Sequence, residues 1–326
     1  MVRVLDLFCG AGGFALGFQR AGFDLLGGID NDYLTLRTYK NNIKCKKTLN
    51  ADISELHSLD IRNEFNLLNP PDVIIASPPC EPFTIANANR KKRALSRLYD
   101  DEQGRLFLEA IRIIGDFKPK IFVIENVKNI LDKKIKESII YELNRVGYDE
   151  VFFNLLYAKS YGCPSQRKRV FISNYELNLK RTPITSNQFV INNLPEDSLY
   201  SDLPNQTHAT IPENYVKKVY KLRWNQALVY FPSAISRRKS FKNWEKLYPY
   251  DIAPPVMGNS RFIHPFEHRP LTVREHAMLM TFPDDFKFYG GIKSQYNQVG
   301  EAVPPFLAFR IAKIIKLVIE INSYNK

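Results

Sequence analysis

The sequence has few cysteines and no long apolar run, and each of these absences excludes a class of protein. Its four cysteines form no Cys-x-x-Cys pair and lie near no histidine cluster, so neither a zinc site nor a disulfide framework is predicted. We therefore expect no bound metal and a reducing compartment. No apolar stretch approaches the roughly 18 residues of a membrane helix. Because the first residues run directly into a strand-like pattern, we expect a soluble, unsecreted, cytoplasmic protein with no membrane partner.

Acidic residues are also scarce relative to basic ones. The chain has 46 Lys and Arg against 34 Asp and Glu, a formal net charge of +12, which favours a polyanionic partner. With 326 residues, 44% of them hydrophobic, it can bury the core of one large domain and a smaller one.

The first half of the chain alternates short strand-like runs with longer helix-like segments. This alternation predicts a doubly wound α/β domain, in which helices wrap a mostly parallel sheet. Strands are expected at 2–8, 25–29, 73–76, 121–124 and 170–173, and helices at 13–21, 34–41, 106–117 and 138–146. A final apolar helix at 305–321 is expected to pack back on this domain.

After about Tyr175 the pattern becomes irregular, which predicts a second, smaller domain. Aromatic residues alternate with basic ones there, and residues 176–265 hold 12 Lys or Arg against 7 Asp or Glu. This excess suits contacts with phosphates, and we expect Arg237 and Arg238 to bind DNA. The alternative is a solvated surface over ordinary core aromatics.

A glycine-rich turn follows the first predicted strand. Residues 10–15 match the pattern G-x-G-x-x-A between a strand and a helix, and Gly10, Gly12 and Gly13 would let the backbone approach a ligand. Asp30, placed 20 residues after Gly10, would accept hydrogen bonds from ribose hydroxyls, and Asp52 could reach an adenine amino group. Nicotinamide and flavin enzymes share this pattern, so it predicts a nucleotide-type ligand of open identity.

Two reactive side chains follow predicted strands directly. Cys80 comes after the strand 73–76 and two prolines, and Glu125 comes after the strand 121–124. Open α/β sheets bind ligands at the carboxyl ends of their strands, so the thiol and the carboxyl group could face one pocket. The other three cysteines are interpreted as buried core residues.

Cytosine chemistry gives this pairing a reason. Carbon 5 of cytosine is a poor nucleophile until a thiolate adds to carbon 6, and a protonated Glu125 at ring nitrogen 3 would stabilise the charge that then develops. Arg167 and Arg169 could donate to the carbonyl oxygen of the base and to a nearby phosphate, although such a basic run could equally be an exposed lead-in to a strand.

A base stacked in a duplex cannot reach such a pocket and must be flipped out. The segment 81–100 could close over the DNA, and we expect its basic run to contact phosphates; the alternative is a disordered basic loop. The residues of this run are Arg90, Lys91, Lys92 and Arg93.

These motifs, in this order, resemble those of the C5-cytosine DNA methyltransferase family, over nearly the whole chain outside 176–265. The matching segments are 6–14 for the cofactor motif, 78–80 for the nucleophile, 125–127 for the glutamate, 167–169 for the arginines, 269–275 for the segment that supports the recognition domain, and 300–305 for the closing motif.

The resemblance implies a DNA (cytosine-5)-methyltransferase with a Rossmann-like domain that binds S-adenosylmethionine. Cys80 would attack the ring, Glu125 and Arg169 would hold the base, and Arg167 would position nearby backbone. Residues implied to contact the cofactor are Phe8, Gly10, Gly12, Gly13, Asp30, Asp52 and Pro79.

The resemblance also implies a division of the chain and a set of partners. Residues 1–176 and 285–326 would form the catalytic domain, and 177–284 a target recognition domain with its hinge. The protein would act on double-stranded DNA in a prokaryotic cell, as a monomer that accompanies a restriction endonuclease without binding it. Which bases flank the target cytosine does not follow from the sequence.

Two positions depart from the family pattern: Ser165 stands where Gln is usual, and Glu301 where Asn is usual. Two other functions remain open. A related subgroup methylates tRNA, but it carries a Cys-Phe-Thr signature, whereas this chain has no cysteine after Cys163. A catalytically silent DNA-binding relative would not need Cys80, Glu125 and both arginines.

Overall fold

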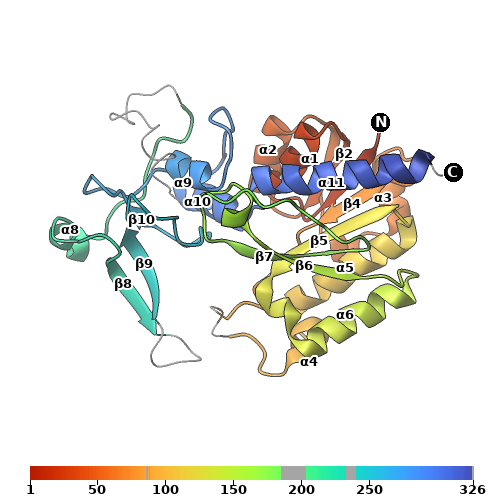
Figure 1. Ribbon diagram of the computed structural model, residues 1–326, viewed down its shortest axis with the longest axis horizontal. Coiled ribbons are helices and arrows are strands. Elements are labelled where there is room, and N and C mark those ends of the chain that lie inside the picture. Colours follow the sequence, from red (N-terminus) through yellow and green to blue (C-terminus); the bar gives the residue numbers. More distant parts are fainter. Residues whose placement is uncertain (86, 88, 185–202, 233–239, 325–326) are drawn as a thin grey trace.

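A computed structural model describes residues 1–85, 87, 89–184, 203–232 and 240–324, and its largest feature is a seven-stranded sheet (Figure 1). The strand order is β3-β2-β1-β4-β5-β7-β6. Strands β1 to β5 run parallel, and β7 runs antiparallel to both β5 and β6. The strands are β1 (Arg3–Leu7), β2 (Asp24–Asp30), β3 (Cys45–Asn50), β4 (Val73–Ala76), β5 (Ile121–Val127), β6 (Phe152–Tyr157) and β7 (Lys168–Ser173).

All five strands expected from the sequence are confirmed, and the two that were not expected are the edge strands β3 and β6. An edge strand is covered less completely than a central one, so it needs no continuous apolar run. In β3 no residue is fully buried, and its Lys46 and Lys47 are exposed. This strand therefore lacks the pattern by which the others were predicted.

Helices cover both faces of the sheet (Figure 1). Successive residues of a strand point to opposite faces: Val73 and Ile75 join the core under α1, α2 and α11, whereas Ile74 and Ala76 join the core under α3, α5 and α6. The expected packing of the last helix on this domain is confirmed, because α11 lies along α1. The helices are α1 (Gly13–Arg20), α2 (Tyr33–Asn42), α3 (Ser58–Glu64), α4 (Ala94–Tyr99), α5 (Glu102–Phe117), α6 (Lys133–Arg145) and α11 (Pro305–Tyr324).

The longest helix on the second face, α5, shows how the sequence sets the bounds of an element. Its Asp101 accepts hydrogen bonds from the amides of Gln103 and Gly104, both at 3.1 Å, which caps the helix. Its buried positions, among them Phe107 and Ile114, recur with helical spacing. The helix ends at Lys118, whose φ of 51° is left-handed.

A smaller sheet lies beyond the large one, at the left of Figure 1. It has the order β10-β9-β8, with β8 antiparallel and β10 parallel to β9. Its elements are α8 (Glu213–Val219), β8 (Ala227–Pro232), β9 (Ser240–Lys246) and β10 (Phe262–Ile263), and between the two sheets lie α9 (Val273–Leu279) and α10 (Ile292–Glu301). Three short 3-10 turns occur at Ile53–Glu55, Lys128–Leu131 and Ala158–Ser160.

Candidate active site

The loops that follow β1, β4 and β5 meet at one edge of the large sheet. Strand β4 pairs with β1 on one side and β5 on the other, and the chain order of the sheet reverses between β1 and β4. The amide of Ser77 donates to the carbonyl of Leu7 at 3.1 Å, which holds the first two loops together. Ligands of open α/β sheets bind at such a reversal.

The loop after β1 has a left-handed backbone at Phe8, Gly10 and Gly12, with φ of 53°, 53° and 92°. A side chain at Gly12 would place its Cβ 2.7 Å from Cγ1 of Ile43, and one at Gly13 would lie 2.3 Å from the carbonyl oxygen of Val303. These two glycines thus allow close packing within the protein. At Gly10 no heavy atom lies within 4 Å of such a Cβ, which leaves room for a ligand.

Asp30 supports this loop from the end of β2. Its Oδ2 accepts a hydrogen bond from the amide of Gly10 at 2.9 Å, and its Oδ1 accepts one from Asp32 at 3.0 Å. Burial raises the pKa of Asp30, although these amides oppose the shift. Asp52 follows β3 at the same edge, where it is exposed and accepts a bond from the amide of Ser54 at 2.9 Å.

Cys80 lies in the loop after β4, and hydrogen bonds and core packing hold this loop in place. The carbonyl of Cys80 accepts hydrogen bonds from the amides of Phe83 and Thr84 at 3.1 and 3.0 Å. Phe83 is buried and packs edge to face on Phe107. Pro79 is half-buried beside the thiol. The loop is therefore anchored to the core.

The thiol of Cys80 is protonated at neutral pH. Burial, and then the charge of Glu81, raise its pKa to about 11, and the guanidinium groups of Arg169 and Arg167 oppose this shift. A thiol in this state is a weak nucleophile, so a nucleophilic role for Cys80 would require activation.

Glu125 and Arg169 form an ion pair beside this thiol. Strands β5 and β7 are neighbours, and Nε of Arg169 lies 2.8 Å from Oε1 of Glu125. The two side chains are 16% and 6% exposed, so the pair is shielded from bulk water. Both of its charges act on Cys80. The structure thus brings Cys80, Glu125 and Arg169 together.

Arg167 turns toward other parts of the chain. Its Nη1 donates to the carbonyls of Val256 and Gly300 at 2.8 and 2.6 Å, and its Nη2 to that of Glu301 at 3.2 Å. It is 2% exposed, and burial lowers its pKa to about 9, so it stays charged at neutral pH. Its hydrogen bonds join its own segment to the backbone at Val256 and to the end of α10.

Sequence reasoning did not assign a role to two asparagines that hold the loop after β4. Nδ2 of Asn126 donates to the carbonyl of Pro78 at 3.2 Å, and Nδ2 of Asn129 donates to that of Phe83 at 2.9 Å. The only signal in the sequence was that Asn126 is next to Glu125. Its hydrogen-bond partner, Pro78, lies 48 residues away in the chain, so no local pattern predicted the contact.

The basic segment expected to contact DNA lies at the surface. Lys91, Lys92 and Arg93 are exposed and Arg90 is half-buried. Arg97 holds their backbone, with hydrogen bonds to the carbonyls of Lys91 and Lys92 at 2.7 and 2.9 Å. This segment reaches toward the β8–β9 side of the molecule (Figure 1). The other two expected DNA contacts, at positions 237 and 238, lie outside the described residues.

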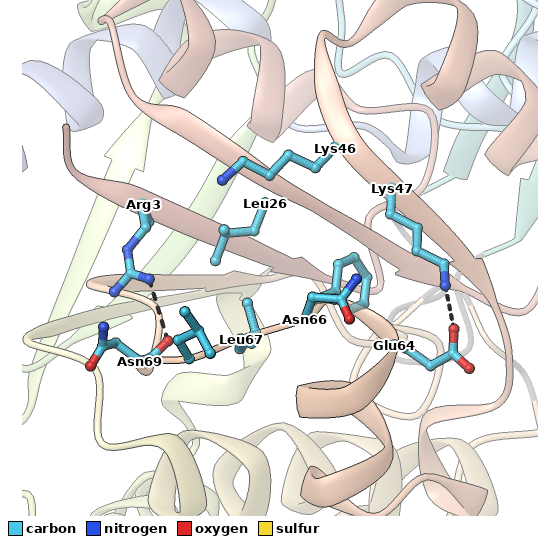
Figure 2. Close-up of a pocket in the computed structure, with 10 residues that line it drawn as sticks. Arg3, Leu26, Lys46, Lys47, Glu64, Asn66, Leu67 and Asn69 are labelled. Carbon is cyan, nitrogen blue, oxygen red and sulfur yellow. Dashed lines mark hydrogen bonds and ion pairs between the residues drawn. The ribbon is translucent and has the colours of Figure 1, made fainter.

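A separate cavity lies at the other end of the sheet (Figure 2). Its cations already have partners: Arg3 donates to the carbonyl of Pro70 at 2.6 Å, Lys46 pairs with Asp24 at 3.2 Å, and Lys47 pairs with Glu64. It adjoins the amino ends of β1 and β3, away from Cys80. We therefore do not assign it to the reaction.

The described residues offer neither a metal site nor a membrane-spanning helix. Among the described residues, no three His, Cys, Asp or Glu side chains are grouped so that they could hold a metal ion. In the same part of the chain, no helix is long and apolar enough to cross a membrane.

Known proteins resemble this chain over most of its length. The family model of C-5 cytosine-specific DNA methylases matches residues 2–317. The chain is 42% identical to M.MJ0563P of Methanocaldococcus jannaschii, assigned as a type II methyltransferase, over 97% of this chain and 99% of that protein. It is 32% identical to the type II methyltransferase M.DdeI of Desulfomicrobium norvegicum, over 99% and 91% of the two chains.

The fold also matches a solved structure. A crystal structure assigned as a DNA modification methyltransferase from an E. coli prophage superposes with a TM-score of 0.76, at 24% identity, over 98% of this chain and 100% of that one. At this identity the likeness supports the fold alone.

Proposed function

The chain belongs to the C-5 cytosine-specific DNA methylase family, and from this premise we propose how its residues carry out the reaction. It is a DNA (cytosine-5)-methyltransferase of the type II restriction-modification kind. We propose that it methylates carbon 5 of a cytosine flipped out of double-stranded DNA, within a short specific sequence, through a covalent adduct between Cys80 and carbon 6.

The loop after β1 fits S-adenosylmethionine, which supplies the methyl group when bound. The open side of Gly10 and the carboxylate of Asp30 support this assignment, because a carboxylate whose oxygens each accept one amide still has lone pairs for ribose hydroxyls. Asp52 would accept from the adenine amino group. Phe8 and Pro79, from the loops after β1 and β4, would line the same site.

Cys80 would begin the reaction by releasing its thiol proton to solvent and forming the sulfur–carbon 6 bond. The electron pair of the broken ring double bond moves toward carbon 5, which becomes nucleophilic. Glu125, protonated on substrate binding, would donate to ring nitrogen 3 and stabilise this charge. Carbon 5 would then take the methyl group that S-adenosylmethionine supplies. When the proton of carbon 5 leaves to solvent, its electron pair re-forms the ring double bond, the sulfur–carbon 6 bond breaks and the thiolate of Cys80 re-forms.

Arg169 links these two groups. In the free protein it pairs with Glu125, and we propose that it shifts to the carbonyl oxygen of the base as the carboxyl group takes up a proton. Arg167 would act as a positioning residue through the three carbonyls that it binds.

We propose that residues 177–284 form the recognition domain with its hinge, and that 1–176 and 285–326 form the catalytic domain. The cations at 90–93 would bind DNA phosphates and help to close the site over the flipped base. The enzyme would act as a monomer in a prokaryotic cytoplasm, paired in function with a restriction endonuclease.

A single observation carries this proposal: a half-buried thiol lies beside a shielded Glu–Arg pair at the carboxyl ends of neighbouring strands, next to a glycine loop. A nucleotide-binding protein without this chemistry would have no need for that combination. Cys80, Glu125 and Arg169 come from three neighbouring strands and act as one group.

The proposal is tested by methyl transfer from labelled S-adenosylmethionine to unmethylated genomic DNA and, in parallel, to tRNA, followed by bisulfite sequencing. We expect label at cytosines within one short DNA sequence. Label on tRNA alone, or none from a folded protein that binds the cofactor, would overturn the proposed substrate.

The matched variant is Cys80→Ser, which removes the thiolate and changes the volume little. We expect Cys80→Ser to lose methyl transfer with unchanged cofactor binding, measured by calorimetry. The control is Cys163→Ser, which removes a thiol from another part of the protein. Undiminished turnover by Cys80→Ser would exclude the proposed nucleophile.

A further inference from the structure

A second cavity lies in the smaller part of the molecule, between the loop before β8 and the segment after β10. Its volume is about 480 Å³. The site proposed above does not use it. We name it the Lys246 cavity, and its lining residues are Leu222, Arg223, Trp224, Lys246, Pro265 and Phe266.

Lys246 is buried in this cavity, with 7% of its surface exposed. Within the described part of the chain, no hydrogen bond or ion pair involves its Nζ. Lysines are almost never this buried unless they are paired, because an unpaired buried charge is costly. Nζ of Lys246 is not among the fully buried unpartnered atoms, so it can be reached from the cavity and is suited to an anionic ligand.

Hydrogen bonds fix the backbone of Lys246, and the carboxylate of the adjacent Glu245 pairs with another lysine. The amide of Lys246 donates to the carbonyl of Gln226 at 2.8 Å, and its carbonyl accepts from the amide of Asn225 at 2.8 Å. The carboxylate of Glu245 is occupied by Lys242, whose Nζ lies 2.8 Å away. Burial lowers the pKa of Lys246, which agrees with a charge that lacks compensation.

The rim of the cavity is aromatic. Trp224 and Phe266 are 45% and 51% exposed. The ring of Trp224 is held in place, because its Nε1 donates to the carbonyl of Pro265 at 2.9 Å and its ring lies 5.5 Å from that of Tyr248. Fixed, exposed aromatic rings beside cations are the features on which proteins stack nucleobases.

We propose that the Lys246 cavity binds one nucleotide of the substrate DNA other than the target cytosine. Its phosphate would pair with Lys246 and Arg223, and its base or sugar would lie on Trp224 and Phe266. The lining of the cavity suits a ligand in which an anion is joined to a flat, largely apolar group. The choice of DNA as the source rests on the proposed function.

The fluorescence of Trp224 tests this placement. The chain has two tryptophans, so Trp244→Phe leaves Trp224 as the only reporter. We expect unmethylated substrate DNA to quench this fluorescence in a saturable way, and Lys246→Met in the same background to weaken the quenching. No quenching by DNA that the same sample methylates would overturn the proposal and leave the proposed function intact.

The salt dependence of DNA affinity tests the phosphate contact. Each phosphate contact contributes about 0.9 to the slope of log K against log salt, so Lys246→Met should reduce the slope by about one. The control is Lys217→Met in α8, an exposed lysine that removes the same charge, and it should change the slope less. Equal changes in both variants would mean a general charge effect and would overturn the proposal.

Two further measurements separate the alternatives. Free dAMP is titrated against the same reporter: saturable quenching by dAMP with none by DNA would assign the cavity to a free nucleotide and overturn the choice of DNA. The melting temperature of Lys246→Met without DNA should match or exceed that of the wild type, because the variant loses an unpaired buried charge. A marked decrease would show that this lysine stabilises the fold.

Discussion

Cys80 shows how neighbouring charges set the reactivity of one side chain. At pH 8, a pKa of about 11 leaves a thiolate fraction on the order of one in a thousand. Burial makes the largest contribution to this shift, and Glu81, the next residue in the chain, makes the second. In the free protein the proposed nucleophile is therefore almost entirely in its unreactive thiol form.

The first prediction follows from this charge. Glu81→Gln should lower the pKa of Cys80 and increase its alkylation by iodoacetamide at pH 8 by about 3- to 10-fold, measured by peptide mass spectrometry with Cys45 as an internal reference. Glu150→Gln, at an exposed site, should leave the rate unchanged. An unchanged rate in Glu81→Gln would show that burial alone sets the reactivity of Cys80.

A second residue, Glu301, stands where the family usually has Asn. Glu301 is exposed at the surface, but its carboxyl group is packed closely enough that partial burial raises its pKa to about 7; the charges of Glu81, Asp30 and Asp32 add to the shift, which Arg167 opposes. Between pH 4.5 and 7 the folded protein thus keeps a proton that the unfolded chain releases. Stability associated with this group is present at low pH and is lost as the pH rises through 7.

Because solvent screens a charge at an exposed site, Glu301→Gln should raise the melting temperature at pH 8 only slightly, by about 1 °C, and the difference should shrink toward zero at pH 5. Calorimetry at both pH values measures it. The control is Glu55→Gln, which removes an exposed carboxylate elsewhere. A difference of the same size at pH 5 would contradict the assigned pKa.

At the scale of elements, the packing of α1 on α11 joins the two ends of the chain. Gly17 permits it, because a Cβ there would lie 2.3 Å from Cβ of Ala308 and 2.4 Å from the backbone nitrogen of Phe309. Helix α1 begins at the end of the glycine loop, so its position against α11 also sets the position of that loop.

Gly17→Ala should destabilise the protein by about 1–3 kcal/mol through overpacking, although the same change in an exposed helix usually stabilises it. Chemical denaturation measures the effect. The second change Ala308→Gly should recover part of the loss, since it removes one of the two clashing groups. A stabilised Gly17→Ala variant would mean that the two helices separate easily.

At the scale of the whole molecule, Arg167 joins the large sheet to the segment near Val256 and to the end of α10. The backbones of these last two segments also meet closely, since a Cβ on Gly300 would lie 2.1 Å from the carbonyl carbon of Met257. The guanidinium of Arg167 therefore fixes the position of these two segments relative to the large sheet.

Arg167→Met should lower the free energy of unfolding by on the order of 3 kcal/mol, because buried carbonyls lose their donors. Hydrogen exchange should increase in 256–260 and 300–301, and kcat should fall more than cofactor affinity. Lys168→Met, at an exposed neighbouring residue, serves as the control. Wild-type exchange in Arg167→Met would contradict its role as the joint between these segments.

The sequence alone determined the central strands and the positions of Cys80 and Glu125 at their ends. Both depend on local patterns: apolar runs form buried strands, and the residue that follows a parallel strand must lie at the ligand-binding edge. The same reasoning missed the edge strand β3, where partial exposure removes the apolar run, and it left the apolar run FFNLLY of the edge strand β6 unassigned.

Only the tertiary structure decided what each basic side chain does. Arg167 and Arg169 lie two positions apart, yet one binds the carbonyl of Gly300 and the other pairs with Glu125. Lys246 is ordinary in the sequence and becomes distinctive only because it is buried without a partner. Charge is a property of the residue, whereas burial and pairing depend on segments that folding brings from far along the chain.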